Sequence, residues 1–167
     1  MVESLYERDA LAWAEQQADL LRRLAAGERL NAAVDWPNVI EEVQDVGQSQ
    51  LRACRSLLQQ GMRHLLKCQA WPESSAVAHW REEAGVFLVD AEDCFTPSMQ
   101  QRIVLGELYA KALRLVRSMR DLSSNPRPLP DHCPFTLDEL LAGDTDQLLG
   151  TLARTAPSRD AEQESSP

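Results

Sequence analysis

Apolar residues recur at three- and four-residue steps along most of the chain, which is the spacing of one face of an α-helix. The first such stretch opens at Ser4 with Glu7 three residues later, a pattern typical of a capping box at a helix start. Its apolar positions are Leu11, Ala14, Ala18, Leu21 and Ala25. We therefore predict a first amphipathic helix that ends near Gly27, followed by a short link over 27–34.

The longest periodic stretch runs from Asp35 to Trp71. Pro37 suits its first turn, because the N–H that proline lacks would be unpaired there anyway. Gly47 is a place where the helix can bend or break, whereas Gly61 would let a neighbouring helix approach closely. The pattern predicts one buried stripe, made of Ile40, Val43, Gly47, Leu51, Cys54, Leu58, Gly61, Leu65 and Cys68.

Two further stretches have the same helical spacing. Ser74 or Ser75 can cap a third helix, whose buried positions we predict as Val77, Trp80, Ala84, Phe87, Leu88 and Ala91. Thr96 followed by Pro97 indicates the start of a fourth helix, with a stripe of Leu105, Leu108, Ala112, Leu115, Met119 and Leu122. A proline-rich connector follows over 125–134, and a second capping box, Thr136 with Glu139, opens a short helix through Leu141.

These elements predict an all-α fold: four main helices in a bundle-like array with a short C-terminal helix. The pattern contains no convincing strand. The length of 167 residues suits one domain with a real core, so we expect a single helical domain over 1–153. The polar, proline-flanked residues 154–167 are expected to form a disordered tail.

Charge and composition narrow the function classes. The net charge of −9 opposes general affinity for nucleic acid or anionic membranes, although it allows a local basic face. No window approaches the ~20 apolar residues of a membrane span, and the first residues lack the basic start of a signal peptide. We therefore expect a cytoplasmic protein that does not insert into membranes.

The sequence contains no complete catalytic or metal-binding motif. Its four cysteines are widely spaced without a Cys-x-x-Cys pair, so we interpret them as reduced core residues and expect no metal. A glycine-rich phosphate loop, Gly-x-Ser-x-Gly and His-Glu-x-x-His are all absent, and we expect no cofactor. These absences favour a protein that is not an enzyme.

The polar residues of 35–71 offer the best candidates for a hidden catalytic or metal site. Glu41, Glu42 and His64, with Lys67, combine carboxylates and an imidazole suited to general-base chemistry. On one straight helix Glu42 and His64 would lie roughly 33 Å apart, so only a sharp turn near Gly47 brings them together. Another histidine, His79, precedes the adjacent glutamates 82 and 83, which we interpret as a solvated helix face.

Two stretches are locally basic and define candidate binding residues. Residues 48–72 contain no acid but include Arg52, Arg55, Arg63 and Lys67. In residues 103–120, one glutamate is outweighed by Lys111, Arg114, Arg117 and Arg120. Such faces suit an anionic partner, either a nucleic acid or an acidic protein. No aromatic residues interleave with the arginines, which weakens the case for binding single strands by stacking.

The ordered motifs together resemble the bacterial domain-of-unknown-function family twenty-nine. The matching pieces are residues 6–18, Asp35-Trp36 with 39–43 and 46–47, residues 64–67, Trp80-Arg81, and residues 133–141. The resemblance covers about Leu5 to Leu141. Cys68 stands where the family pattern has tryptophan after the lysine, and the 27–34 link is longer than expected. The resemblance implies an all-helical fold and an uncharacterised function, and it supplies no catalytic assignment.

Three hypotheses for function follow. The leading one is a non-enzymatic helical module that binds a protein partner or forms a homo-oligomer, with Leu148, Leu149 and Leu152 as a small exposed apolar edge. The second is a nucleic-acid-linked regulator or antitoxin-like component that uses the basic faces. The third is an enzyme or metal site that uses Glu42 and His64.

Overall fold

The computed structural model describes residues 4–30, 33–119 and 125–157. Within these ranges the regular elements are helices and no strand occurs, which confirms the all-α prediction. No helix in this part of the chain is both long enough and apolar enough to cross a membrane. The chain divides into two compact units, 1–49 and 50–167, and the expectation of a single domain over 1–153 stays a prediction.

The first unit begins with two helices where the pattern predicted one. The Ser4–Glu7 capping box is confirmed at the start of α1 (Leu5–Arg8). At Asp9 the backbone leaves the helical conformation, and the Asp9 carboxylate instead accepts the Ala12 N–H at 3.0 Å to cap α2 (Ala10–Ala25). Aspartate favours this arrangement because its short side chain competes for backbone donors. α2 ends as expected before Gly27, whose φ of +94° is left-handed.

Asp35 forms hydrogen bonds that connect α2 to the start of the long helix. Its carboxylate accepts hydrogen bonds from the indole of Trp13 at 3.2 Å and from the amide of Asn38 at 2.7 Å. Its backbone N–H donates to Gln17 at 2.9 Å. The Asn38 bond is the main reason that the pKa of Asp35 is lowered.

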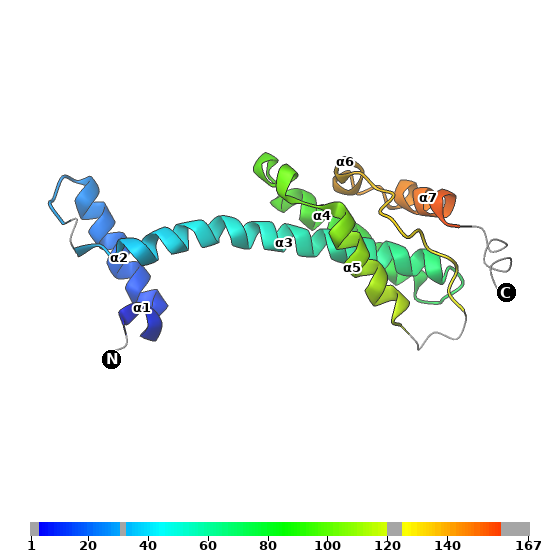
Figure 1. Cartoon of the computed structure of the whole chain (residues 1–167), viewed down its shortest axis with the longest axis horizontal. Helices are drawn as coiled ribbons and strands as arrows, with labels where there is room; N and C mark the ends of the chain where they lie inside the picture. Colours follow the sequence, from blue (N-terminus) through cyan, green and yellow to red (C-terminus); the bar gives the residue numbers. More distant parts are fainter. Residues whose placement is uncertain (1–3, 31–32, 120–124, 158–167) are drawn as a thin grey trace, which may run out of the picture. The chain divides into compact units, whose positions relative to one another are not determined.

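α3 (Trp36–Ala70) is a single uninterrupted helix, as Figure 1 shows, and it continues through Gly47. From Leu51 onward the predicted stripe is buried. The first part of the prediction is wrong, because Ile40 is 53% exposed and Val43 is 70% exposed. Within the first unit, Glu42 contacts α1 through the Tyr6 hydroxyl, whereas Ile40 and Val43 face solvent. Periodicity identifies an apolar face, but it does not say what covers that face.

The second unit packs α4 (Val77–Cys94) and α5 (Leu105–Arg117) against the second half of α3. The cap of α4 is Ala76 rather than Ser74 or Ser75. The predicted fourth helix is two elements, a 3₁₀ helix η2 (Pro97–Arg102) and α5, because residues 103–104 are extended. Leu115 is 41% exposed instead of buried, and Leu122 lies outside the described residues.

Two short helices complete the second unit. The Thr136–Glu139 capping box is confirmed at α6 (Leu137–Leu141). A further helix that the pattern did not predict, α7 (Thr145–Thr155), starts where the Asp144 carboxylate accepts two backbone N–H groups. The expected exposed apolar edge is wrong, since Leu148 and Leu152 are fully buried in the core and Leu149 packs against it. Residues 158–167 of the expected tail are outside the described residues.

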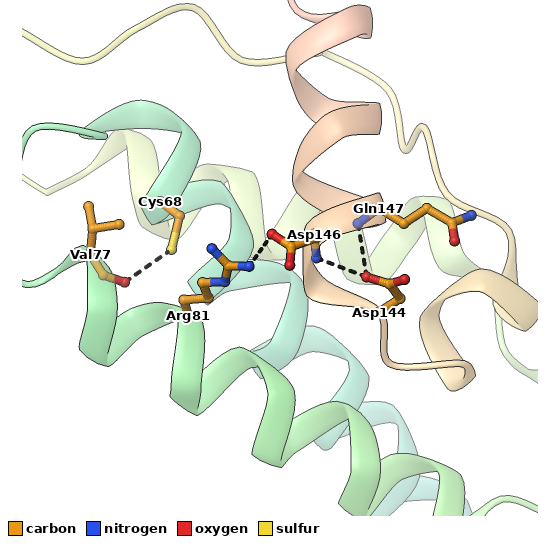
Figure 2. A network of polar contacts seen from close by, with 6 residues as sticks. All are labelled: Cys68, Val77, Arg81, Asp144, Asp146 and Gln147. Atoms are coloured by element: carbon orange, nitrogen blue, oxygen red, sulfur yellow. Dashed lines mark hydrogen bonds and ion pairs between the residues drawn. The ribbon is translucent and has the colours of Figure 1, made fainter.

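Figure 2 shows how α7 meets α4. The guanidinium of Arg81 forms an ion pair with the carboxylate of Asp146 in the first turn of α7, next to the Asp144 cap. One turn earlier, at the start of α4, the Cys68 thiol of α3 donates to the Val77 carbonyl at 3.7 Å. The polar contacts therefore link α3, α4 and α7 around the leucine core.

The proline-rich connector is held at two points. The Arg127 N–H donates to the carbonyl of Ala70 at the end of α3, at 2.8 Å. The buried Tyr109 hydroxyl of α5 donates to the Pro130 carbonyl at 2.7 Å. Between these points Leu129 is buried in the core, so the connector is part of the packed structure.

Candidate functional site

The most unusual polar cluster in the described residues surrounds His64, on the face of α3 that packs against α4. Its Nδ1 atom lies 2.9 Å from the Oε2 atom of Glu83, and the His79 Nε2 atom lies 3.4 Å from the same oxygen. His64 is only 8% exposed, and its Nδ1 has no hydrogen-bond partner, so the contact with Glu83 is close but poorly aligned for a hydrogen bond. The ring also packs against Phe87, with centroids 5.5 Å apart.

Lys67 is the second buried ionisable residue of the cluster. It is 8% exposed, one turn after His64 on α3, and its Nζ lies 4.7 Å from the centre of the Trp80 ring. The negative face of an indole ring attracts a cation, which partly compensates for the loss of water. A buried lysine without a hydrogen-bonded carboxylate is nevertheless uncommon.

Burial governs the protonation of both residues. It lowers the pKa of His64 to about 4, with a further lowering by the charge of Lys67, and the opposing attraction of Glu83 does not compensate. The imidazole is therefore neutral at pH 7. Burial also lowers the pKa of Lys67, and the charge of Arg63 adds to that effect.

A surface hollow of about 280 Å³ adjoins this cluster. It is lined along α4 by His79, Glu82, Glu83, Val86 and Phe87. Glu83 thus belongs to the hollow and also contacts the buried imidazole of His64. A neutral imidazole beside a carboxylate is a pairing found in general-base sites, but His64 itself does not line the hollow.

The structure gives the sequence-predicted candidates different partners. His64 and Lys67 lie together, and the carboxylate beside His64 is Glu83 rather than Glu41 or Glu42. Glu42 accepts a hydrogen bond from the Tyr6 hydroxyl at 2.8 Å within the first unit, and this bond raises the pKa of Tyr6 to about 12. Glu41 is exposed. α3 continues through Gly47, where the hypothesis of a Glu42–His64 site needed a sharp turn.

Glu83 is the residue that sequence reasoning placed on a solvated face. Its four-residue spacing from His79 was a correct local signal, since these two side chains do meet. The contact with His64 joins positions on different helices, so no spacing within one helix could have indicated it. Among the described residues, no group of three or more His, Cys, Asp or Glu side chains could hold a metal ion.

The predicted basic binding residues separate into two groups. Arg52 and Arg55 line a second hollow of about 310 Å³, together with Lys111 from the other basic stretch. Lys67 is buried beside Trp80, and the Nε of Arg63 is buried without a hydrogen-bond partner. The two basic stretches of the sequence therefore come together at this hollow between α3 and α5. Only Arg52, Arg55 and Lys111 take part, and the rest of each stretch does not line the hollow.

The first unit presents an uninterrupted apolar row on α3. Ile40, Val43 and Val46 follow one another at three-residue steps and are 53%, 70% and 61% exposed. Gly47 extends this row, and a Cβ added there would meet nothing within 4 Å. We call these four residues the α3 row.

Comparisons with known proteins place the chain among helical proteins. A family model described as "Domain of unknown function DUF29" matches residues 5–145. The chain is similar to a crystal structure of an α-helical protein of unknown function from Rhodospirillum rubrum, with 30% identity and a TM-score of 0.62. That alignment covers 92% of this chain and 99% of the other. None of the curated proteins compared matches the chain.

Proposed function

We propose that this chain, which belongs to the domain-of-unknown-function family DUF29, is a helical interaction module that associates with a second copy of itself. The observation that carries the proposal is the exposure of the α3 row, with Val43 70% exposed in the middle of a well-formed helix. Large aliphatic side chains that are exposed singly are ordinary, but a contiguous row on one helix face is typical of an interaction surface.

The charge distribution around α3 supports a second copy as the occupant. At about 100° per residue, Glu41 and Asp45 lie on the side of the helix roughly opposite the α3 row. Glu42 is turned toward Tyr6 of α1. The row itself carries no charge, so two copies can pair face to face without bringing like charges together.

The shape of the row supports the same partner. In a two-fold dimer the same patch contacts itself, and when the two helices run antiparallel the first residue of one row meets the last residue of the other. Gly47 at the end of the row leaves open space, into which Ile40 of an antiparallel copy can pack. Small residues at such positions allow two helix backbones to approach closely.

Light scattering coupled to size-exclusion chromatography tests the proposal over a wide range of protein concentrations. We expect a dimer that dissociates on dilution, and Val43→Asp should give a monomer because a buried, unpaired carboxylate is strongly unfavourable. Val89→Asp is the matched control, since Val89 is 51% exposed on α4, and this variant should still dimerise.

Gly47→Leu separates a specific interface from non-specific hydrophobic attraction. A leucine there enlarges the apolar surface but blocks close approach, so a specific pairing is weakened and a non-specific one is strengthened. A wild-type protein that is monomeric at every concentration, or a Val43→Asp variant that still dimerises, would refute self-association through the α3 row.

We propose a packing role rather than catalysis for the His64, Lys67 and Glu83 cluster. The support is the low exposure of His64 and Lys67, 8% each, which leaves little room for a substrate to reach the imidazole. We also propose that the module acts in the bacterial cytoplasm, where its four unbridged cysteines stay reduced.

A further inference from the structure

The hollow between α3 and α5 gathers cationic and hydrogen-bonding side chains from both helices. It is lined by Arg52, Arg55, Ser56, Gln59, Leu108 and Lys111, and its volume is about 310 Å³. Three of these six residues have cationic side chains, namely two arginines and a lysine. Ser56 and Gln59 add a hydroxyl and an amide donor. Leu108 is 2% exposed and contributes an apolar contact to the same hollow.

We infer that this hollow binds the phosphate group of a small molecule. Guanidinium groups present several N–H donors in a fixed plane that matches phosphate oxygens, and a lysine ammonium adds a compact charge. Positions 52 and 55 lie one turn apart on α3, so both arginines line the same side of the hollow while Lys111 lines it from α5. The arrangement supplies donors from two directions around one anion.

The distribution of cations favours a compact phosphate over a nucleic acid. A polynucleotide needs a track of exposed cations along its backbone. The continuation of the α3 basic stretch does not provide one, because Lys67 is buried and the Nε of Arg63 is enclosed. The net charge of −9 also opposes the approach of a long polyanion, whereas a small anion responds mainly to its immediate surroundings.

Glu107 at the start of α5 competes with a bound anion for Arg55. One of its carboxylate oxygens lies 3.4 Å from the Arg55 guanidinium, and its side chain is 59% exposed. This long, solvated ion pair is weak, so an incoming phosphate can displace it. Removal of the Glu107 charge should consequently strengthen phosphate binding.

Isothermal titration calorimetry of the full chain, with pyrophosphate and a nucleoside 5′-monophosphate as probes, tests the site at low salt. We expect saturable binding that Arg55→Gln and Lys111→Gln each weaken by roughly two- to fivefold, the range of a solvent-accessible ion pair. Glu107→Gln should tighten binding by a similar factor. Circular dichroism confirms that each variant remains folded.

Two controls have matched charge changes away from the hollow. Arg154→Gln removes one cation from an exposed position of α7 that does not line the hollow, and Glu82→Gln removes one acid from α4. Both should leave the affinity within about twofold of wild type, because neither side chain lines the hollow and water weakens charge interactions at longer range. If these controls change binding as much as the hollow variants do, general electrostatics explains the effect and the site is overturned.

Titrations with nucleic acid test whether the hollow prefers a polymer to a small phosphate. A duplex DNA and a single-stranded RNA are titrated under the same conditions. Tighter binding of either polymer than of pyrophosphate, with the same dependence on Arg55, overturns the assignment to a small phosphate. Lack of saturation by both small probes up to about 10 mM overturns the site itself, since that corresponds to a binding free energy weaker than roughly 3 kcal/mol. The α3 row plays no part in this site, so these results and those on self-association are independent.

Discussion

Gly61 of α3 and Leu88 of α4 approach so closely that a Cβ atom on Gly61 would lie 2.7 Å from Cδ2 of Leu88. Leu88 has no solvent exposure, so its side chain cannot move aside into water. The absence of a side chain at position 61 therefore sets how closely α3 and α4 pack.

Gly61→Ala should destabilise the protein although alanine is the better helix former. The gain in helix propensity is about 1 kcal/mol, whereas overpacking a filled core typically costs about 1–3 kcal/mol. Urea unfolding followed by circular dichroism should show a lower midpoint. Gly106→Ala in α5 is the control, because a Cβ there meets nothing within 4 Å. An unchanged or raised midpoint for Gly61→Ala would show that Leu88 has room to adjust.

The buried imidazole of His64 should make stability depend on pH. Its pKa in the folded state is about 4, below the value of about 6.5 for an unfolded histidine, so the unfolded chain binds more protons between these values. The stabilisation that comes from keeping the buried His64 neutral is fully present above pH 6.5 and is lost as the pH falls toward 4, in total about 3 kcal/mol. The charges of Lys67 and Arg63 work in this direction, while Glu83 opposes it.

His64→Gln should flatten the stability profile between pH 6.5 and 4, as measured by urea midpoints across that window. His132→Gln serves as the matched control, because His132 is exposed in the proline-rich connector. Equal slopes for wild type and His64→Gln would mean that other groups cause the acid sensitivity.

The attachment of α7 should depend on its leucines much more than on its ion pair. Leu152 is fully buried, so Leu152→Ala is expected to cost about 2–5 kcal/mol through lost contacts and a cavity. The Arg81 and Asp146 side chains are 42% and 77% exposed, and Arg81→Ala should cost under about 1 kcal/mol. Chemical denaturation of the two variants compares these losses directly, and the reverse order would contradict the assignment of the core.

Tyr109→Phe isolates one buried hydrogen bond. The variant keeps the ring and leaves the Pro130 carbonyl without its 2.7 Å donor, which should cost about 1–3 kcal/mol. Tyr6→Phe removes a hydroxyl of the same kind that bonds the exposed Glu42 carboxylate, and water can replace that bond. Only the first variant should therefore lower the thermal midpoint; equal effects would indicate that the Pro130 carbonyl is hydrated.

Local signals in the sequence predicted the helices well. Both capping boxes, the stop at Gly27 and the close approach at Gly61 are present, because each depends on residues near one another or on the size of one side chain. The misplaced boundaries have local causes too. Asp9 divides the first predicted helix, and Asp144 starts a helix that contains the leucines predicted as an exposed apolar edge.

The candidate site was less predictable, because its contacts join separate helices. Nothing in the spacing of His64 indicates that Glu83 is its neighbour, and nothing in that of Arg52 indicates Lys111. The predicted exposure of some apolar side chains was also wrong, because it depends on which other elements cover a helix face. Ile40 and Leu148 have equivalent helical spacing, yet one faces solvent and the other is covered by the core.

The proline-rich connector between α5 and α6, which contacts the end of α3 and the side of α5, has a consequence for proteolysis. Exposed connecting segments are usually the preferred sites of proteolytic cutting, because a protease needs to draw an extended stretch into its active site. Here the Arg127 amide is bonded to Ala70, the Pro130 carbonyl is bonded to Tyr109, and Leu129 between them is buried. Cleavage within 127–130 requires all three attachments to open together, so this segment should survive digestion about as long as the helices on either side of it.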